Sequence, residues 1–263
     1  MKWVLFFALV IGAAVAILFT VFPEWDLAIT GLFWDASHRY FPLAGTGWAR
    51  TARSLANYIP WAIALPAFAA LALKVIFPRR RMFMPARAAV LLALTMALGP
   101  GLVVNGILKQ EWGRPRPVHV DDFGGKAEFR PWYATDGTCP GNCSFVSGEG
   151  ALGFWLVAPA SLLPPGPLRA VALVGAVAFG AAAGGLRITF GGHFFTDVVF
   201  SGVLVVLIVV LVRLWLYDRR GAPSDAVVEL AIGRVALKLQ KGARALWRRA
   251  CAALRRRLTR AGR

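Results

Sequence analysis

The sequence has few charged residues and very few acidic ones. Charged side chains make up 16% of the 263 residues, and 13 Asp and Glu stand against 30 Lys and Arg. With 58% apolar residues and a mean hydropathy of +0.60, the composition lies outside the range of soluble domains. This scarcity of charge excludes an ordinary soluble enzyme and predicts an integral membrane protein.

Cysteine and histidine are also scarce, and the sequence lacks evident internal repeats. The chain has three Cys and three His, and no repeat or low-complexity linker stands out. Cys139 and Cys143 share a polar loop, Cys-Pro-Gly-Asn-Cys, that has no nearby His or further Cys. We therefore expect no metal site there, because zinc sites in proteins need three or four such ligands.

The net charge of +17 is concentrated in the C-terminal tail, because 13 of the 30 Lys and Arg follow residue 217. An anionic membrane surface explains such a tail better than nucleic acid, so we expect no nucleic-acid partner. Within the tail (218–263), an amphipathic helix is predicted over 225–260. A solvated or partly disordered tail is the alternative. The apolar positions are Val228, Ile232, Val235, Leu239, Leu246, Leu254 and Leu258, and the cations among them include Arg255, Arg256 and Arg257.

Six apolar stretches are long enough to cross about 30 Å of hydrocarbon. They are 3–22, 55–77, 86–108, 146–163, 168–188 and 196–217. They predict an all-α fold, a six-transmembrane-helix bundle over 1–217, with one or two interfacial helices in the aromatic segment 24–53. A Pro-rich break between the fourth and fifth stretches predicts a tight helical hairpin. A cleaved signal peptide is the alternative for the first stretch, but its apolar run is too long and its end lacks small residues.

The basic residues between the stretches orient the bundle. Arg79, Arg80, Arg81, Arg87, Arg169 and the tail share one side, which should be cytoplasmic. Both termini are then inside a bacterial-type inner membrane, and the loops 23–54, 109–145 and 189–195 face the periplasm. An oxidising compartment permits a disulfide between Cys139 and Cys143, with a reduced pair as the alternative.

Two of the outer segments suit phosphate binding. Lys109, Arg114 and Arg116 follow the third stretch, and prolines stiffen the backbone between the two guanidinium groups. The fourth stretch begins at Ser147–Glu149, where free N–H groups at a helix N-terminus bind anions. A simple helix cap is the alternative role for Ser147.

A third outer segment brings Arg187, His193 and Asp197 together within eleven residues at the membrane edge. Such residues are costly to bury without a use. His193 and Asp197 are four apart, so on a starting helix the carboxylate orients the imidazole and leaves its other nitrogen free to attack. A structural His–Asp pair at a helix start is the alternative. The convergence of three segments on one face favours the functional interpretation.

Together these segments resemble the signature of the type 2 phosphatidic acid phosphatase superfamily, which reads K-x6-R-P, P-S-G-H and S-R-x5-H-x3-D. The resemblance covers residues 50–217 and implies a six-helix phosphatase without a metal or organic cofactor. It implies that His193 is the nucleophile, forming a phosphohistidine, and that Asp197 is its partner. The residues that would bind phosphate are Lys109, Arg116, Ser147, Gly148 and Arg187, with Arg114 beside them.

The sequence departs from this signature at two positions. Leu186 replaces the serine before Arg187, and Glu149 replaces the histidine of the second element. That histidine gives a proton to the leaving alcohol in the family, so Glu149 is expected to be the general acid. It can act only if it holds a proton, which burial favours and neighbouring cations oppose. The alternatives are a good leaving group, such as a diphosphate or sugar phosphate, and loss of activity.

The sequence therefore predicts a membrane enzyme that hydrolyses the phosphate of a lipid. Its partners are the bilayer and a lipid substrate: phosphatidic acid, phosphatidylglycerol phosphate, undecaprenyl diphosphate or lipid A. It would be a phosphoric monoester hydrolase, or an acid anhydride hydrolase for a diphosphate. A lipid-to-lipid phosphotransferase and a non-catalytic protein that binds or transports anionic lipid are the alternatives. The superfamily that the sequence resembles also includes vanadium haloperoxidases, but the apolar stretches disfavour a soluble haloperoxidase.

Overall fold

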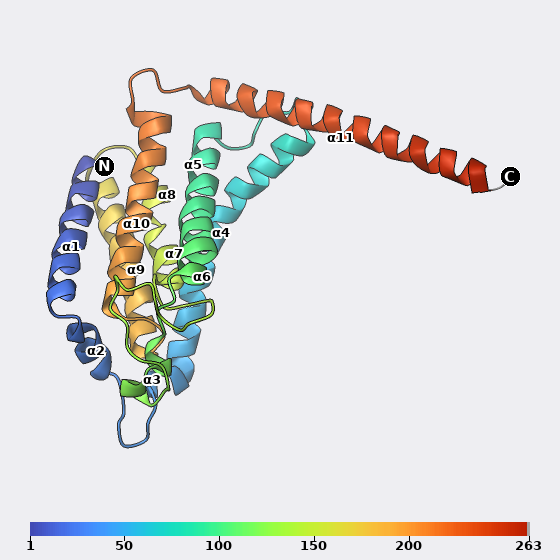
Figure 1. Ribbon diagram of the computed structural model, residues 1–263. Helices are drawn as coiled ribbons and strands as arrows, with labels where there is room; N and C mark the ends of the chain where they lie inside the picture. Colours follow the sequence, from blue (N-terminus) through green and yellow to red (C-terminus); the bar gives the residue numbers. More distant parts are fainter. Residues whose placement is uncertain (262–263) are drawn as a thin grey trace.

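The chain folds as a bundle of helices (Figure 1). The computed structural model describes the backbone of residues 1–261 and the side chains of residues 1–248, and within them only two isolated β-bridges occur. The helices are α1 (Lys2–Val21), α2 (Glu24–Gly31), α3 (Pro42–Gly45), α4 (Gly47–Ile76), α5 (Ala86–Met96), the π-helix η1 (Ala97–Leu108), α6 (Lys109–Glu111), the 3₁₀ turns η2 (Pro117–His119) and η3 (Asp121–Phe123), α7 (Gly148–Phe154), α8 (Val157–Ser161), α9 (Pro167–Thr189), α10 (Phe195–Arg213), the π-helix η4 (Leu214–Asp218) and α11 (Asp225–Ala261).

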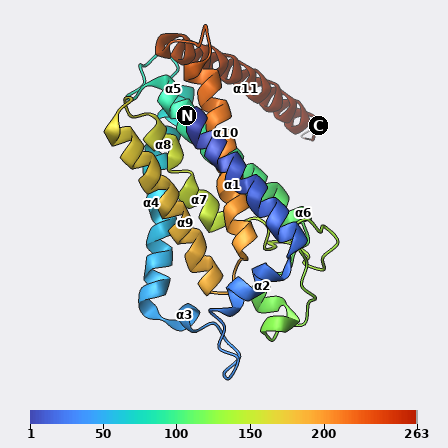
Figure 2. The ribbon, with the colours of Figure 1, turned by 90° about the vertical axis from the view of Figure 1, so that its left-hand side faces the viewer.

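Five continuous helices among the described residues are long and apolar enough to cross a membrane. They are Lys2–Val21, Gly47–Ile76, Ala86–Glu111, Pro167–Thr189 and Phe195–Asp218. They run in broadly the same direction in two perpendicular views, with α4 inclined to the others at its end near α11 (Figures 1 and 2). The third combines α5, η1 and α6, and the fifth combines α10 and η4. The predicted all-helical membrane bundle is therefore confirmed, with five long helices instead of six.

The fourth predicted stretch, 146–163, differs from the expected single helix. It forms α7 and α8, which are separated at Trp155 and Leu156. Pro159 explains the break, because its ring has no N–H and clashes with the carbonyl four residues earlier, which belongs to Trp155. At this break the Trp155 side chain is fully buried, and its indole N–H donates to Thr95 Oγ1 on α5 at 2.9 Å. Proline, which the hydropathy pattern ignores, thus divides this stretch.

Close contact between α7 and α9 depends on glycine. A Cβ added at Gly153 would lie 2.8 Å from the Gly180 Cα, and one added at Gly180 would lie 2.5 Å from the Phe154 ring. Small residues let two helix backbones approach closely inside a membrane. This approach places the start of α7 beside the end of α9, where two of the predicted site segments meet.

The third long helix widens over its second half into η1. Pro100 lies within this π-helix, and the Asn105 side-chain amide donates to the Pro100 carbonyl at 2.6 Å. Wide turns of this kind are frequent at functional sites. Here the turn brings Asn105 and Lys109 to Gly148: a Cβ there would lie 3.0 Å from Asn105 Oδ1 and 3.5 Å from Lys109 Nζ.

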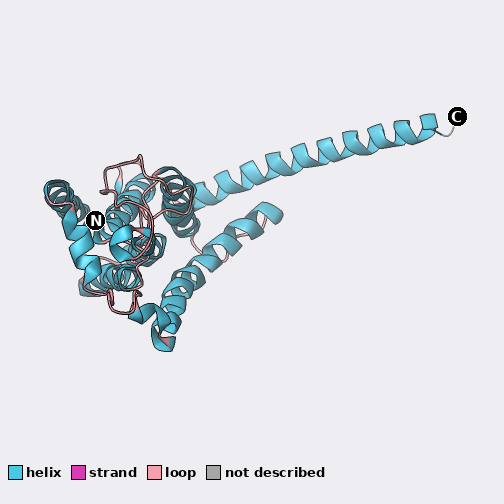
Figure 3. Cartoon of the chain, turned by 60° about the horizontal axis from the view of Figure 1, so that its bottom comes forward, coloured by secondary structure: helices cyan, strands magenta, loops and turns pink. Residues whose placement is uncertain are grey.

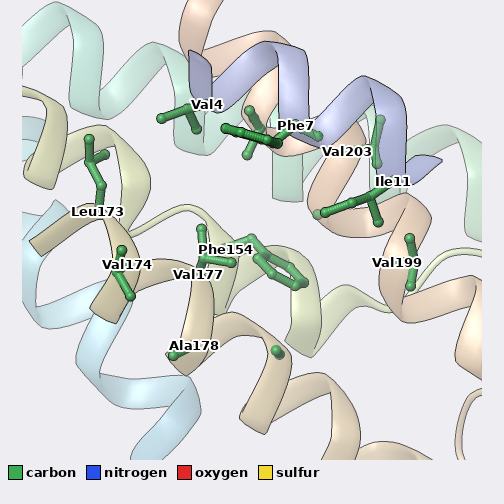
Figure 4. A pocket seen from close by; sticks show the side chains of 14 residues that line it. Val4, Phe7, Ile11, Phe154, Leu173, Val174, Val177, Ala178, Val199 and Val203 are labelled. Carbon is green, nitrogen blue, oxygen red and sulfur yellow. The ribbon is translucent and has the colours of Figure 1, made fainter. Parts of the chain in front are cut away.

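An apolar cavity of about 470 Å³ lies between α1, α9 and α10 (Figure 4). All 14 residues that line it are apolar, and Val4, Phe7, Ile11 and Val174 are among those that point toward it. An apolar lining of this kind is compatible with lipid acyl chains. The cavity is therefore consistent with helices that lie in a membrane.

The N-terminus and the start of α11 lie at one end of the bundle, while α2, α3 and the long loops lie at the other (Figure 1). From its start, α11 extends away from the bundle as one helix of 37 residues (Figure 3). A helix over 225–260 is thus present as expected. The side chains of Leu254, Leu258 and Arg255–Arg257, on which part of its predicted amphipathicity rests, lie outside the described residues.

Candidate active site

The structure holds the His193 ring in one orientation. The ring is almost fully buried (1% exposed), and its Nδ1 lies 2.7 Å from the Ser144 carbonyl oxygen. A carbonyl only accepts, so Nδ1 carries the proton and Nε2 keeps its lone pair. Burial lowers the pKa of His193 to about 4, against the opposing effect of Asp197. At neutral pH the ring is therefore an uncharged imidazole with Nε2 available for attack.

Asp197 supports this ring less directly than its spacing predicts. His193 precedes α10, which begins at Phe195, and the Asp197 carboxylate lies 3.5 Å from Nδ1. Its Oδ2 accepts from Ser144 Oγ at 2.5 Å and from the Phe194 N–H at 2.8 Å. Asp197 thus caps its own helix and fixes Ser144, and Ser144 supplies the shorter bond to the imidazole.

Arg114 is placed differently from the phosphate-binding role expected of it. Its side chain is fully buried, 0% exposed, and its guanidinium lies over the Phe194 ring. Nη1 donates to Asp197 Oδ1 at 2.6 Å, and Nε donates to the Arg130 carbonyl at 2.9 Å. Arg114 therefore lies behind Asp197, as a buried partner of that carboxylate.

Asp26 completes this buried network, and the sequence analysis missed it. Its Oδ2 accepts from Arg114 Nη2 at 2.8 Å and from Thr196 Oγ1 at 2.6 Å, while Oδ1 accepts from the Thr196 N–H at 3.0 Å. Burial raises the pKa of Asp26, and the Arg114 guanidinium opposes that shift. The sequence feature that could have pointed to Asp26 is the presence of an acidic residue in the largely apolar segment after α1. The network joins α2 to the start of α10.

Cys139 and Cys143 form a disulfide with a Cα–Cα distance of 5.8 Å, and their loop holds Arg116. The Cys143 N–H donates to the Lys109 carbonyl at 2.8 Å. Arg116, half-buried, donates through Nη2 to the Asn142 carbonyl at 2.8 Å and to Asn142 Oδ1 at 2.7 Å. The disulfide loop thus joins the first predicted site segment to the second.

The start of α7 lies against these cations. Ser147 Oγ accepts from the Gly150 N–H at 3.2 Å, which is the helix-capping role given as its alternative. The Ser147 N–H donates to the Asp197 carbonyl at 3.0 Å, so the second and third segments are also joined. With Lys109 Nζ beside Gly148, the structure brings all three predicted segments together.

Glu149 lies between two arginines. Its carboxylate accepts from Arg53 Nε at 2.9 Å and Nη2 at 2.6 Å, and its Oε1 lies 3.3 Å from Arg187 Nε. Arg187 is packed so tightly that a Cβ at Gly192 would lie 2.3 Å from its Nη2. Arg53, on α4, was also missed by the sequence analysis, because an arginine at a span end is usually a membrane anchor. A carboxylate that accepts from one guanidinium group and forms an ion pair with a second is a poor proton donor.

The assembled site is an uncharged histidine near cations from the first and third predicted segments, with the start of α7 beside them, in an arrangement suited to phosphoryl transfer. Residues 88–221 match the PAP2 superfamily. The chain belongs to the PAP2 superfamily. Its superfamily and its similarity to named phosphatases make it a phosphoric monoester hydrolase in a helical membrane bundle.

Two similar proteins are both lipid A 4'-phosphatases. The chain is 34% identical over 218 residues to the lipid A 4'-phosphatase of Francisella tularensis subsp. novicida (strain U112), which covers 81% of this chain and 98% of the relative. It is 42% identical over 105 residues to the lipid A 4'-phosphatase of Rhizobium leguminosarum, covering 40% of this chain and 45% of the relative. No solved structure matches the chain significantly.

Proposed function

We propose that this PAP2 superfamily member is a membrane lipid phosphatase that removes a phosphate group from lipid A. The choice of lipid A as the substrate is supported by the similarity to a lipid A 4'-phosphatase over 98% of that relative's length. Phosphatidic acid, phosphatidylglycerol phosphate and undecaprenyl diphosphate are the competing substrates. Lipid A ranks above them because they have no comparable support.

His193 is the proposed nucleophile. Its Nδ1 proton is held by the Ser144 carbonyl at 2.7 Å, so Nε2 attacks phosphorus in line with the departing oxygen and forms a phosphohistidine. Water then releases inorganic phosphate from Nε2. Asp197 stabilises the positive charge that the imidazole acquires during attack, from 3.5 Å away.

Lys109, Arg116 and Arg187 are the proposed phosphate ligands, with the Gly148 N–H and Ser147 beside them. In support of this role, Lys109 and Arg116 are close enough to His193 to oppose its protonation, and the burial of Lys109 and Arg187 strengthens their attraction to an anion. They neutralise the equatorial oxygens of the transferring phosphoryl group. Arg114 is proposed to act through Asp197, because its guanidinium donates to two carboxylates and a carbonyl.

For Glu149, the geometry favours a positioning role over the proton-donating role expected from the sequence. The carboxylate accepts three hydrogen bonds of 2.6–3.0 Å from Arg53 and lies 3.3 Å from Arg187 Nε. It therefore sets where the Arg187 guanidinium meets the phosphate. We propose that Glu149 orients these arginines.

We further propose that α7 and α8 together form a sixth crossing, within a phosphatase domain over 1–217 that precedes the tail at 218–263. The site then lies at the end of the bundle opposite the N-terminus and α11 (Figure 1). The basic loops and tail at the other end support a cytoplasmic location for both termini and a periplasmic site in the inner membrane.

The test is phosphate release by the purified protein in lipid nanodiscs from lipid A and from the three competing lipids. We expect release from lipid A, and a fall of at least about 1,000-fold for His193→Ala. His119→Ala is the matched control, because that histidine is exposed. No release from lipid A, with release from another lipid of the panel, would refute the proposed substrate.

Two further measurements examine the chemistry. With lipid A labelled in its phosphate, the wild type but not His193→Ala should trap an acid-labile, alkali-stable label on the protein. Phosphate should be released without any acceptor lipid. Release that requires a second lipid, with the label passing to that lipid, would instead establish the phosphotransferase alternative.

A further inference from the structure

A basic cavity lies at the end of the bundle opposite His193, where the loop after α4 meets α11. Its volume is about 380 Å³. Its lining combines four cationic side chains with three large apolar ones. The cations are Arg79, Arg80, Lys241 and Arg244, and the apolar residues are Ile76, Phe77 and Leu237. None of them belongs to the phosphatase site described above.

The positive charge of this cavity is not balanced by acidic side chains in the part of the chain whose side chains the structure describes. No Asp or Glu of that part is among the residues that line the cavity. Among the side chains of residues 1–248, no carboxylate lies within 4.0 Å of any of the four cationic groups. Four cations that share one small cavity repel one another, and an anion bound between them relieves that repulsion.

The walls of the cavity are held in place by bonds at both ends. The Gln240 side-chain amide donates to the Val75 carbonyl at 2.7 Å and to the Ile76 carbonyl at 3.0 Å. Nearer the start of α11, Glu229 accepts from the buried Lys74 ammonium at 2.8 Å and from the Met82 N–H at 3.0 Å. The cavity therefore exists before any ligand binds, which reduces the entropy lost on binding.

The location of the cavity at the membrane surface indicates that its ligand is a lipid. The loop between α4 and α5 joins two candidate spans, so it lies at the membrane surface. Phe77 and Phe83 are exposed in this loop, as aromatic residues at a bilayer interface commonly are. Ile76, Phe77 and Leu237 supply an apolar wall beside the cations. A ligand with a phosphate and an acyl chain satisfies both parts of the lining.

We propose that this cavity binds one anionic phospholipid from the leaflet at that end of the bundle. Its phosphate would lie between Arg79 and Arg80 on one wall and Lys241 and Arg244 on the other. Its first acyl carbons would follow Ile76 and Leu237. Bound in this way, the lipid fastens the first half of α11 to α4 and to the membrane.

The experiment is native mass spectrometry of the detergent-purified full chain, titrated with phosphatidylglycerol or with zwitterionic phosphatidylcholine. Two double variants are compared, K241Q/R244Q in the cavity and K238Q/R248Q outside it. Each removes one Lys and one Arg from α11, so the net charges are identical. At about a fivefold effect per cation, the cavity pair should weaken the tightest phosphatidylglycerol site roughly 30-fold, and the control pair should leave it unchanged.

Phosphatase activity in detergent serves as the folding control, and it should be unchanged in both double variants. Equal weakening by the two pairs would overturn the proposal, because it would show attraction to a charged helix without a defined site. Equally tight binding of phosphatidylcholine would also overturn it. Inorganic phosphate should not displace the lipid at matched concentration, and displacement would show that the acyl chain contributes nothing.

Discussion

Replacing Asp26 by Asn should destabilise the protein and impair catalysis, although Asp26 lies outside the region that matches the PAP2 superfamily. Its two carboxylate oxygens accept three hydrogen bonds, from Arg114 Nη2, Thr196 Oγ1 and the Thr196 N–H. An amide has one oxygen. In either orientation its NH₂ group faces a donor, either the Arg114 guanidinium or the Thr196 N–H.

The magnitude follows from burial. Arg114 is fully buried and Asp26 is 1% exposed, so water does not replace a lost bond. Breaking one arm of a buried ion pair and leaving one donor unsatisfied costs about 3 kcal/mol. For a protein of this size that corresponds to a fall in melting temperature of roughly 5–10 °C. Because Arg114 also holds Asp197 at 2.6 Å, kcat should fall as well.

The assay is thermal unfolding in detergent together with steady-state phosphate release. Glu24→Gln is the matched control, since Glu24 is an exposed acid in the same helix. It should shift the melting temperature by less than about 1 °C. An equal small shift for Asp26→Asn would refute the reasoning. So would additive losses, within about 0.5 kcal/mol, in a cycle with Arg114→Gln, because a shared network predicts that the double variant loses less than the sum.

Three further predictions concern the site itself. Glu149→Gln should slow substrates with good and poor leaving groups alike, by roughly 10–100-fold, because Arg187 is displaced; a loss confined to poor leaving groups, measured against p-nitrophenyl phosphate, would restore Glu149 as the general acid. The pKa of His193 is lowered to about 4, so the imidazole becomes protonated, and kcat/KM falls, only as the pH drops through about 4. The profile must first be corrected for titration of the substrate phosphate. A fall in kcat/KM near the usual histidine pKa of about 6.5 would contradict the buried neutral ring. The same shift has a stability counterpart, because the unfolded chain takes up the proton first: stability should be full above about pH 6.5 and decline as pH falls toward 4. Cys139→Ser should destabilise the loop by about 2 kcal/mol and raise KM, because Arg116 loses its ordered anchor; dithiothreitol should do the same to the wild type and nothing more to the variant, and an unchanged KM in both would contradict this role.

Much of the fold could be predicted because a membrane-spanning helix depends on the composition of one continuous stretch of sequence. A run of about 20 apolar residues satisfies its own backbone hydrogen bonds, so composition alone identified five long helices. The same method failed at 146–163, where Pro159 breaks a stretch that hydropathy reads as continuous. The proposed nucleophile and phosphate ligands could be named from the sequence because they lie at characteristic spacings within short segments.

Only the tertiary structure decided how these segments are supported. Asp26 and Arg114 are 88 residues apart, and Arg53 and Glu149 are 96 apart, so no local pattern links either pair. Because of those contacts, Arg114 binds Asp197 and Asp26 instead of facing the phosphate as expected. Glu149 lies between Arg53 and Arg187. The Ser144 carbonyl, which no side-chain pattern reveals, sets the tautomer of His193. The sequence by itself determined which groups the site contains, because their chemistry is carried by residue type. Their protonation and orientation were decided by the folded chain, because both depend on which distant groups pack against them.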